Sequence, residues 1–147
     1  SAPLLELAAL VPLSLAADRL IRFAHWITPP SRPKRFDTHF FVAIAPPEQM
    51  EPSVDGYEIV DSRWCRPQDL INDFHNGTEK LVLPTLMNVM KLTEVNSVDE
   101  AIRMARNRNI IPVTPTLKKT PNGDQLVIPE AAGYGMTEIP TAMLRPA

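Results

Sequence analysis

Two charged side chains stand at the entry to an apolar segment, within the stretch WITPPSRPKRFDTHFF at residues 26–41. Arg35 and Asp37 are two residues apart, so in an extended strand they point to the same face. One interpretation is an ion pair that holds the start of the strand, worth only about 0–1 kcal/mol if exposed. The other is a substrate contact, in which Arg35 offers its planar donor fork to a phosphate and Asp37 orients it. The sequence leaves both interpretations open.

Acidic side chains are a second group that could do chemistry. A magnesium site for diphosphate chemistry needs several hard oxygen ligands on one rigid surface. Glu58 and Asp61 lie in an expected strand beside a loop, where active sites gather, although hydrogen-bonded strand acids are the alternative. Asp69 and Asp73 are one turn apart and are expected to form the solvated face of a short helix. Nowhere do three glutamates share a helical face, so the chain predicts no complete catalytic site and no metal site.

Other common chemistries find little support. None of the five glycines makes a phosphate-cradling loop of the Walker type. The three histidines, His25, His39 and His75, have neither His-x-His nor His-x-x-x-His spacing, which makes them a poor zinc set. The single cysteine, Cys65, is expected to be a small apolar filler at the end of a strand and not a nucleophile.

Charge and composition exclude further classes. The 147 residues include 15 Lys and Arg against 17 Asp and Glu, a formal net charge of −2, so a nucleic acid polymer is not an expected partner. Arg32, Lys34 and Arg35 form a local positive cluster that could grip one small anion. A lone cysteine fits a reducing compartment. The apolar residues 1–18 are interrupted by charge and proline and follow no cationic leader, so neither a membrane span nor a secretory signal is expected, and cytoplasm is the expected location.

The strands that must position these side chains follow from hydrophobic spacing. Strands are predicted over 19–28, 36–45 and 56–65. The second becomes apolar on both parities, which favours a central strand covered on two faces. Trp26 and Trp64 are each expected to be strand-packing aromatics of the core.

Helices and turns are set by proline, glycine and capping signals. Helices are predicted from Pro67, with Gly77 as the stop, and from Pro84, with Met87 and Met90 as core filler. The most secure helix follows the capping box that begins at Ser97, and residues 4–10 are expected to end another. The pair at 122–123, Asn-Gly, predicts a hairpin in which both turn residues take positive φ. Together these signals predict one α+β domain over residues 1–147, a mixed sheet flanked by helices.

The order of several motifs resembles the second half of a Nudix hydrolase, in the branch typified by the peroxisomal coenzyme A diphosphatase and its bacterial relatives. The matching stretches are Trp26-Ile27-Thr28-Pro29, Arg35-Phe36-Asp37-Thr38 with Phe40-Phe41, Glu58 to Asp61 to Trp64 followed by Pro67, Pro84-Thr85-Leu86, and the tail IIPVTPTL…GDQLVIPEAAGY. The resemblance covers roughly residues 4–135, with 110–135 as a family-type hairpin extension. The first two stretches, in that order, are fairly specific to this branch.

The resemblance implies hydrolysis of a nucleoside diphosphate linked to another moiety, such as coenzyme A or a nucleotide sugar, with Mg²⁺ or Mn²⁺. In the family the metal ligands are glutamates of a helix that reads Arg-Glu-x-x-Glu-Glu. No such core occurs in this chain, and by the resemblance it belongs upstream of Ser1. The chain alone is therefore expected to be inactive, the C-terminal portion of a Nudix-like fold without its N-terminal strands and Nudix helix.

Two consequences stay open. The alternative to an enzyme whose Nudix box lies outside this chain is a module without the box, which binds a nucleotide or a protein and does not turn it over. In either case the incomplete sheet should expose an unpaired edge or an apolar face. We therefore expect a homodimer, or association with the missing N-terminal segment.

The first prediction concerns Arg35, studied in the full-length enzyme that the resemblance implies. If its guanidinium forms two parallel hydrogen bonds to a substrate phosphate, Arg35→Lys should raise KM or lower kcat, because an ammonium cannot reproduce that fork. Steady-state kinetics of the two proteins measures the effect. Unchanged KM and unchanged kcat would leave Arg35 and Asp37 as a purely structural pair.

Overall fold

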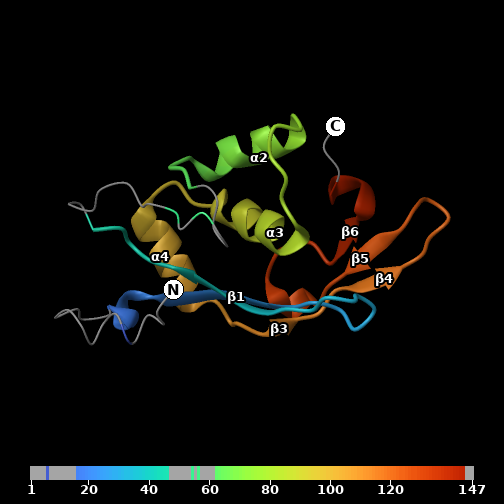
Figure 1. Cartoon of the computed structure of the whole chain (residues 1–147), viewed down its shortest axis with the longest axis horizontal. Helices are drawn as coiled ribbons and strands as arrows, with labels where there is room; N and C mark the ends of the chain where they lie inside the picture. The colour runs from blue at the N-terminus through green and yellow to red at the C-terminus, as the bar shows by residue number, and fades with distance from the viewer. Residues whose placement is uncertain (1–5, 7–15, 47–53, 55, 57–61, 145–147) are drawn as a thin grey trace.

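The computed structural model describes residues 6, 16–46, 54, 56 and 62–144. In chain order, the elements with described bounds are η1 (Ala17–Arg19), β1 (Ile21–Ile27), β2 (Asp37–Val42), α2 (Pro67–His75), α3 (Leu83–Leu92), α4 (Val98–Asn107), β3 (Pro112–Val113), β4 (Thr116–Lys118), β5 (Gln125–Val127), η2 (Glu130–Ala132), β6 (Glu138–Pro140) and η3 (Thr141–Leu144). Helices pack on small sheets, and α2 and α3 lie to the same side of the β1 and β2 ribbons (Figure 1). The predicted α+β class is confirmed.

The described strands form two sheets of three. In the first the order is β2-β1-β3, with β1 antiparallel to β2 and parallel to β3. In the second β4, β5 and β6 pair antiparallel. Thus β1 is the central strand of the first sheet, and β2 alternates between exposed and half-buried side chains. The prediction that 36–45 is covered on both faces is therefore wrong: its exposed parity, which includes Phe41, faces solvent.

A bulge decides which side chains of β1 enter the core. The register with β2 shifts between Arg22 and Ala24, so Phe23 is the extra residue. An inserted residue reverses the side-chain alternation beyond it. Phe23, Ala24 and Trp26 are consequently all buried, whereas Ile27 is only half-buried.

The main core collects buried side chains from β1 and from the elements that follow α2. Around β1 it gathers Leu83 and Met87 of α3, Ala105 of α4, Val113 of β3, and Ile128, Ala132 and Ile139 from the C-terminal segment. A second, smaller cluster joins α2 to α3 through Ile71, Phe74 and Leu86. Met87 is a core residue, as the helical spacing predicted.

Helices α2 and α4 begin where their local signals placed them, and α3 begins one residue before Pro84. Pro67 occupies the first turn of α2, and Gly77 beyond its end takes a positive φ of 75°. At the start of α4, Ser97 Oγ accepts a hydrogen bond from the Glu100 amide at 3.2 Å, while Glu100 Oε2 accepts one from the Asn96 amide at 2.8 Å. This is a capping box whose return bond reaches one residue further than usual. Described helices include none that is long and apolar enough to cross a membrane.

The predicted hairpin is present, but its turn differs. Lys118 pairs with Gln125, so six residues connect β4 and β5. Gly123 has a φ of 113°, whereas no non-glycine residue in the described part takes a positive φ. The prediction of a two-residue turn with both residues at positive φ is therefore wrong. Instead, the Gly123 amide donates to the Thr120 carbonyl, and the Thr120 hydroxyl donates to the Gly123 carbonyl.

The structure describes only part of the strand predicted over 56–65, namely residues 56 and 62–65. Glu58 and Asp61 lie outside the described residues, as does the expected helix end at 4–10, apart from Glu6. Residues 62–65 form no strand, Trp64 is 69% exposed and Cys65 is exposed. The assignment of Trp64 and Cys65 to the interior is therefore wrong, because it depended on a strand that does not extend over them.

One partly buried chain of hydrogen bonds fastens the C-terminal segment to β1. Trp26 Nε1 donates to the Tyr134 hydroxyl at 2.9 Å, which in turn donates to Asn88 Oδ1 at 2.7 Å. The Arg108 guanidinium lies 4.8 Å from the Tyr134 ring and donates to the Ala132 carbonyl. Burial raises the pKa of Tyr134 above its ordinary value of 10.0. Tyr134 is thus a structural link between β1, α3 and the C-terminal segment.

Tyr134→Phe should lower the free energy of unfolding by about 1–3 kcal/mol, because the substitution leaves Trp26 Nε1 and Asn88 Oδ1 without this partner. Since the folded-state pKa is raised, the stabilisation by the neutral hydroxyl is complete below pH 10 and is lost as the pH rises through the raised value. Urea unfolding at neutral pH and above pH 10 should show the difference between the two proteins shrinking with pH. Equal stability of the two proteins at neutral pH would contradict this role.

Candidate functional site

The connection between β1 and β2 is built around Thr28. The Thr28 amide donates to the Phe36 carbonyl at 2.9 Å, and the Phe36 amide donates to Thr28 Oγ1 at 3.1 Å. Arg35 Nε donates to the Thr28 carbonyl at 3.0 Å. One residue therefore closes the proline-rich loop over 29–35 and fixes where the side chains of that loop stand.

Arg35 and Asp37 have separate partners. Arg35 is held by the Thr28 carbonyl, whereas Asp37 Oδ1 lies 2.5 Å from His25 Nε2. The hypothesis that the two form an ion pair with each other is not supported, because each is engaged elsewhere. Asp37 still begins a strand beside the loop that bears Arg35, and both side chains are exposed.

A cleft of about 1370 Å³ opens beside this loop. Its walls come from five regions: the end of β1 and the following loop, the inner face of β2, the start of α3 with the residues before it, the β4–β5 hairpin with the residues before it, and the end of η3. They include Trp26, Thr28, Thr38, Phe40, Leu81, Leu83, Thr116, Leu117 and Leu126. Arg32 and Lys34 also line it, and Arg35 does not. The sequence predicted that Arg32, Lys34 and Arg35 could bind one small anion. In the structure, Arg32 and Lys34 line the cleft.

The cleft combines apolar walls with a cationic rim. Lys34 Nζ lies 5.0 Å from the centre of the Phe36 ring, which holds the ammonium near the loop. Largely apolar clefts with a few well-placed polar groups are typical of small-molecule sites. The arrangement suits a ligand with one apolar or aromatic part and one anionic part.

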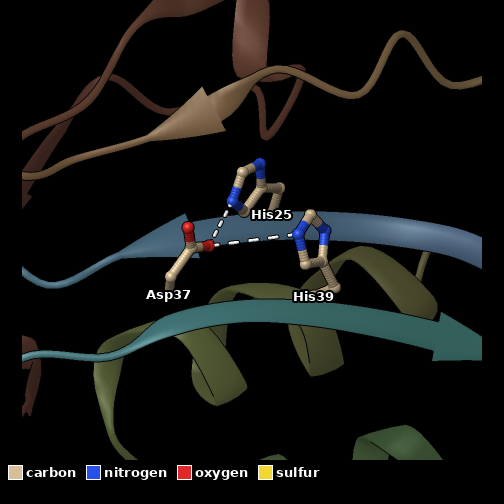
Figure 2. A group of neighbouring side chains, drawn as sticks. All are labelled: His25, Asp37 and His39. Atoms are coloured by element: carbon tan, nitrogen blue, oxygen red, sulfur yellow. Dashed lines mark hydrogen bonds and ion pairs between the residues drawn. The ribbon is translucent and has the colours of Figure 1, made fainter.

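A second group of polar side chains lies across β1 and β2 (Figure 2). His25 and His39 are directly paired in the register, and their rings stack with centroids 4.0 Å apart. Asp37 Oδ1 lies 2.5 Å from His25 Nε2 and 4.0 Å from His39 Nε2. Sequence spacing missed this group because its members are neighbours across strands and not along the chain. The strands predicted at 19–28 and 36–45 contain all three residues, but only the pairing of the two strands shows that their side chains meet.

The described residues do not offer a fitting site for the Mg²⁺ or Mn²⁺ that the resemblance implies. His25, Asp37 and His39 are the described group whose ligand atoms lie close enough together, within 4.8 Å of one another. Two imidazole nitrogens and one carboxylate oxygen are a poor donor set for Mg²⁺, which prefers oxygen. Asp73 on α2 is engaged by Arg63 at 2.6 Å, and this hydrogen bond raises the pKa of the Arg63 guanidinium.

Comparison with curated proteins finds similarity to "Putative nudix hydrolase 7" of Caenorhabditis elegans, 27% identical over 88 residues. The match covers 58% of this chain and 29% of that protein, so the chain spans less than a third of its relative. No protein-family model matches the chain, and no solved structure matches it. The similarity supports a relationship to Nudix hydrolases in general.

Thr28→Val should test how the loop beside the cleft is held. Valine has the same shape but cannot accept the hydrogen bond from the Phe36 amide, so we expect a loss of about 1 kcal/mol in the free energy of unfolding. Amide exchange at Phe36 should also become faster. Thr28→Ser keeps the hydroxyl and is the matched control. If both variants exchange at the parent rate, Thr28 does not hold the loop.

Proposed function

We propose that this chain is the substrate-binding portion of a Nudix-type hydrolase acting on a nucleoside diphosphate linked to another moiety. The similarity to a nudix hydrolase supports the general class. The observation that carries the substrate class is the cleft, whose apolar walls are joined to a rim with Arg32 and Lys34.

The roles of the residues follow from what each can contact. Arg32 and Lys34 carry permanent positive charge and are placed to bind the diphosphate. Phe40, Leu81 and Leu126 offer apolar surface to the nucleoside or to the group linked to it. Thr28 holds the loop and so sets the distance between the cations and the apolar wall. The chain thus binds and orients the substrate.

The carboxylates that support hydrolysis are assigned to sequence outside the described residues. Glu58 and Asp61 remain candidates by sequence, and the Arg-Glu-x-x-Glu-Glu helix of the family is the stronger one. By the same proposal the divalent metal, Mg²⁺ or Mn²⁺, is held by those carboxylates. Its chemistry is to neutralise the negative charge that develops on the diphosphate. Arg35 is retained as a cation next to the cleft that steers an anion, whereas Asp37 is given no part in binding the substrate because its carboxylate lies against His25.

A binding module without hydrolysis is the second candidate. The observation that favours it is that the described residues complete a cleft and lack a carboxylate cage. Such a module binds a nucleotide or a protein, and for a nucleotide ligand the two candidates differ only in turnover. For either, we propose a cytoplasmic protein that associates with itself or with the segment that completes its fold, through the exposed apolar side chains around β2, which are Phe36, Phe41 and Ile44.

The test is calorimetric titration of the 147-residue chain with coenzyme A and with ADP-glucose, in EDTA. Binding of at least one ligand is expected, and Arg32→Gln and Lys34→Gln should each weaken it by about 3- to 10-fold, the loss expected for one exposed charge-assisted contact. Arg106→Gln, on the exposed side of α4, is the matched control and should bind normally.

Three results would overturn the proposal. Absence of binding to both ligands would remove the cleft as a substrate site, as would binding that neither rim variant changes. Hydrolysis of either ligand by this chain alone with Mg²⁺ would show that the carboxylates are within it.

A further inference from the structure

We propose that His25, Asp37 and His39 form a binding site for a transition-metal ion of the Zn²⁺ type on the exposed face of the β1–β2 pair. This site is independent of the cleft and of the proposed hydrolase function. Sequence spacing gave no indication of it, and the donor set differs from the oxygen cage that the resemblance implies.

The three side chains bring their ligand atoms near one another, but the stacked His25 and His39 rings must turn before both imidazoles can face one ion. One ligand atom from each residue lies within 4.8 Å of the others. Zn²⁺ bonds to imidazole nitrogen or carboxylate oxygen are about 2.0–2.2 Å long, which in a tetrahedron separates ligand atoms by about 3.3 Å. The 2.5 Å separation of His25 Nε2 and Asp37 Oδ1 must widen and the 4.0 Å separation of His39 Nε2 and Asp37 Oδ1 must shorten. Asp37 and His39 must therefore both move, and their side chains are 64% and 42% exposed.

The donor chemistry selects the class of metal. Imidazole suits Zn²⁺, Cu²⁺, Ni²⁺ and Co²⁺, whereas Mg²⁺ and Ca²⁺ favour oxygen ligands. Three protein ligands leave the fourth position of a tetrahedron for water, the pattern of an open zinc site. The His25 side chain is 13% exposed and sits in the central strand, so the strand register fixes one ligand before any metal binds.

One neighbouring side chain opposes binding and so provides a sharp test. The Arg22 guanidinium Nη2 lies 3.4 Å from His39 Nδ1. Arginine can only donate, so this contact favours His39 with its proton on Nε2, the nitrogen that faces Asp37. A metal on Nε2 needs that proton moved to Nδ1 and Arg22 displaced. Arg22 is exposed and can move, but its contact and its positive charge should both weaken metal affinity.

The experiment titrates the metal-free chain with Zn²⁺ by calorimetry and with Co²⁺ by visible absorption, in a Cys65→Ser background that removes the exposed thiol. We expect one ion per chain and a Co²⁺ spectrum of four-coordinate type. His39→Gln and Asp37→Asn should weaken affinity by more than about 10-fold, since even outer-shell losses cost about 10–100-fold. Both residues are exposed, so the variants should fold, and circular dichroism verifies this. A large excess of Mg²⁺ should not displace Zn²⁺.

Two further variants distinguish this site from nonspecific metal binding by surface histidines. His75→Gln removes an exposed histidine of α2 outside the cluster and should leave affinity unchanged. Arg22→Gln should tighten Zn²⁺ binding, an effect that a merely structural role of the cluster does not predict. The proposal is overturned if no ion binds, if His39→Gln and Asp37→Asn leave affinity unchanged, if His75→Gln weakens it equally, or if Arg22→Gln weakens it.

Discussion

The bulge at Phe23 sets the orientation of β1, and the rest of the structure depends on that orientation. By inserting one residue against β2, it directs Ala24 and Trp26 into the core and leaves His25 facing the other side. Trp26 then carries the hydrogen bond to Tyr134 that ties the C-terminal segment to the first sheet. A strand without the bulge would present the opposite set of side chains to each face.

The same alternation separates the two candidate sites. Along β2, Thr38 and Phe40 line the cleft, whereas Asp37 and His39 belong to the exposed parity and meet His25. Neighbouring residues of one short strand therefore serve different surfaces. A ligand in the cleft and an ion on the other face can be studied one at a time, because a variant of His39 leaves the lining of the cleft intact.

Local signals in the sequence were sufficient for the helices and for the presence of the hairpin, but not for the length of its turn. Pro67, the box at Ser97 and the Gly123 turn act through their own backbone preferences, which need no knowledge of distant segments. Non-local features were not accessible in this way. A bulge is a property of two paired strands, so the burial of Ala24 could not follow from the pattern of β1 alone. Trp64 is exposed because an aromatic residue is buried only if the surrounding chain supplies a surface for it.

The two candidate sites differ in the same way: the cationic loop could be predicted from local sequence, whereas the histidine cluster could not. The cations of the 29–35 loop were recognisable from composition as an anion grip, and two of them line the cleft. His25 and His39 were visible as residues, but their contact depends on the strand register and on the loop that Thr28 closes. Motif spacing detects ligands that share one helix or one loop. A site assembled across strands can be recognised only after the pairing of those strands is known.

The register of β1 with β2 is the central claim, and nuclear Overhauser contacts between backbone protons of the isotopically labelled chain test it most directly. The account predicts contacts between His25 and His39 and between Ile27 and Asp37, with the irregular step at Phe23. Contacts of His25 with Thr38 or Phe40 in their place, in a ladder without the step, would show a slipped register and would contradict both the core and the cluster described above.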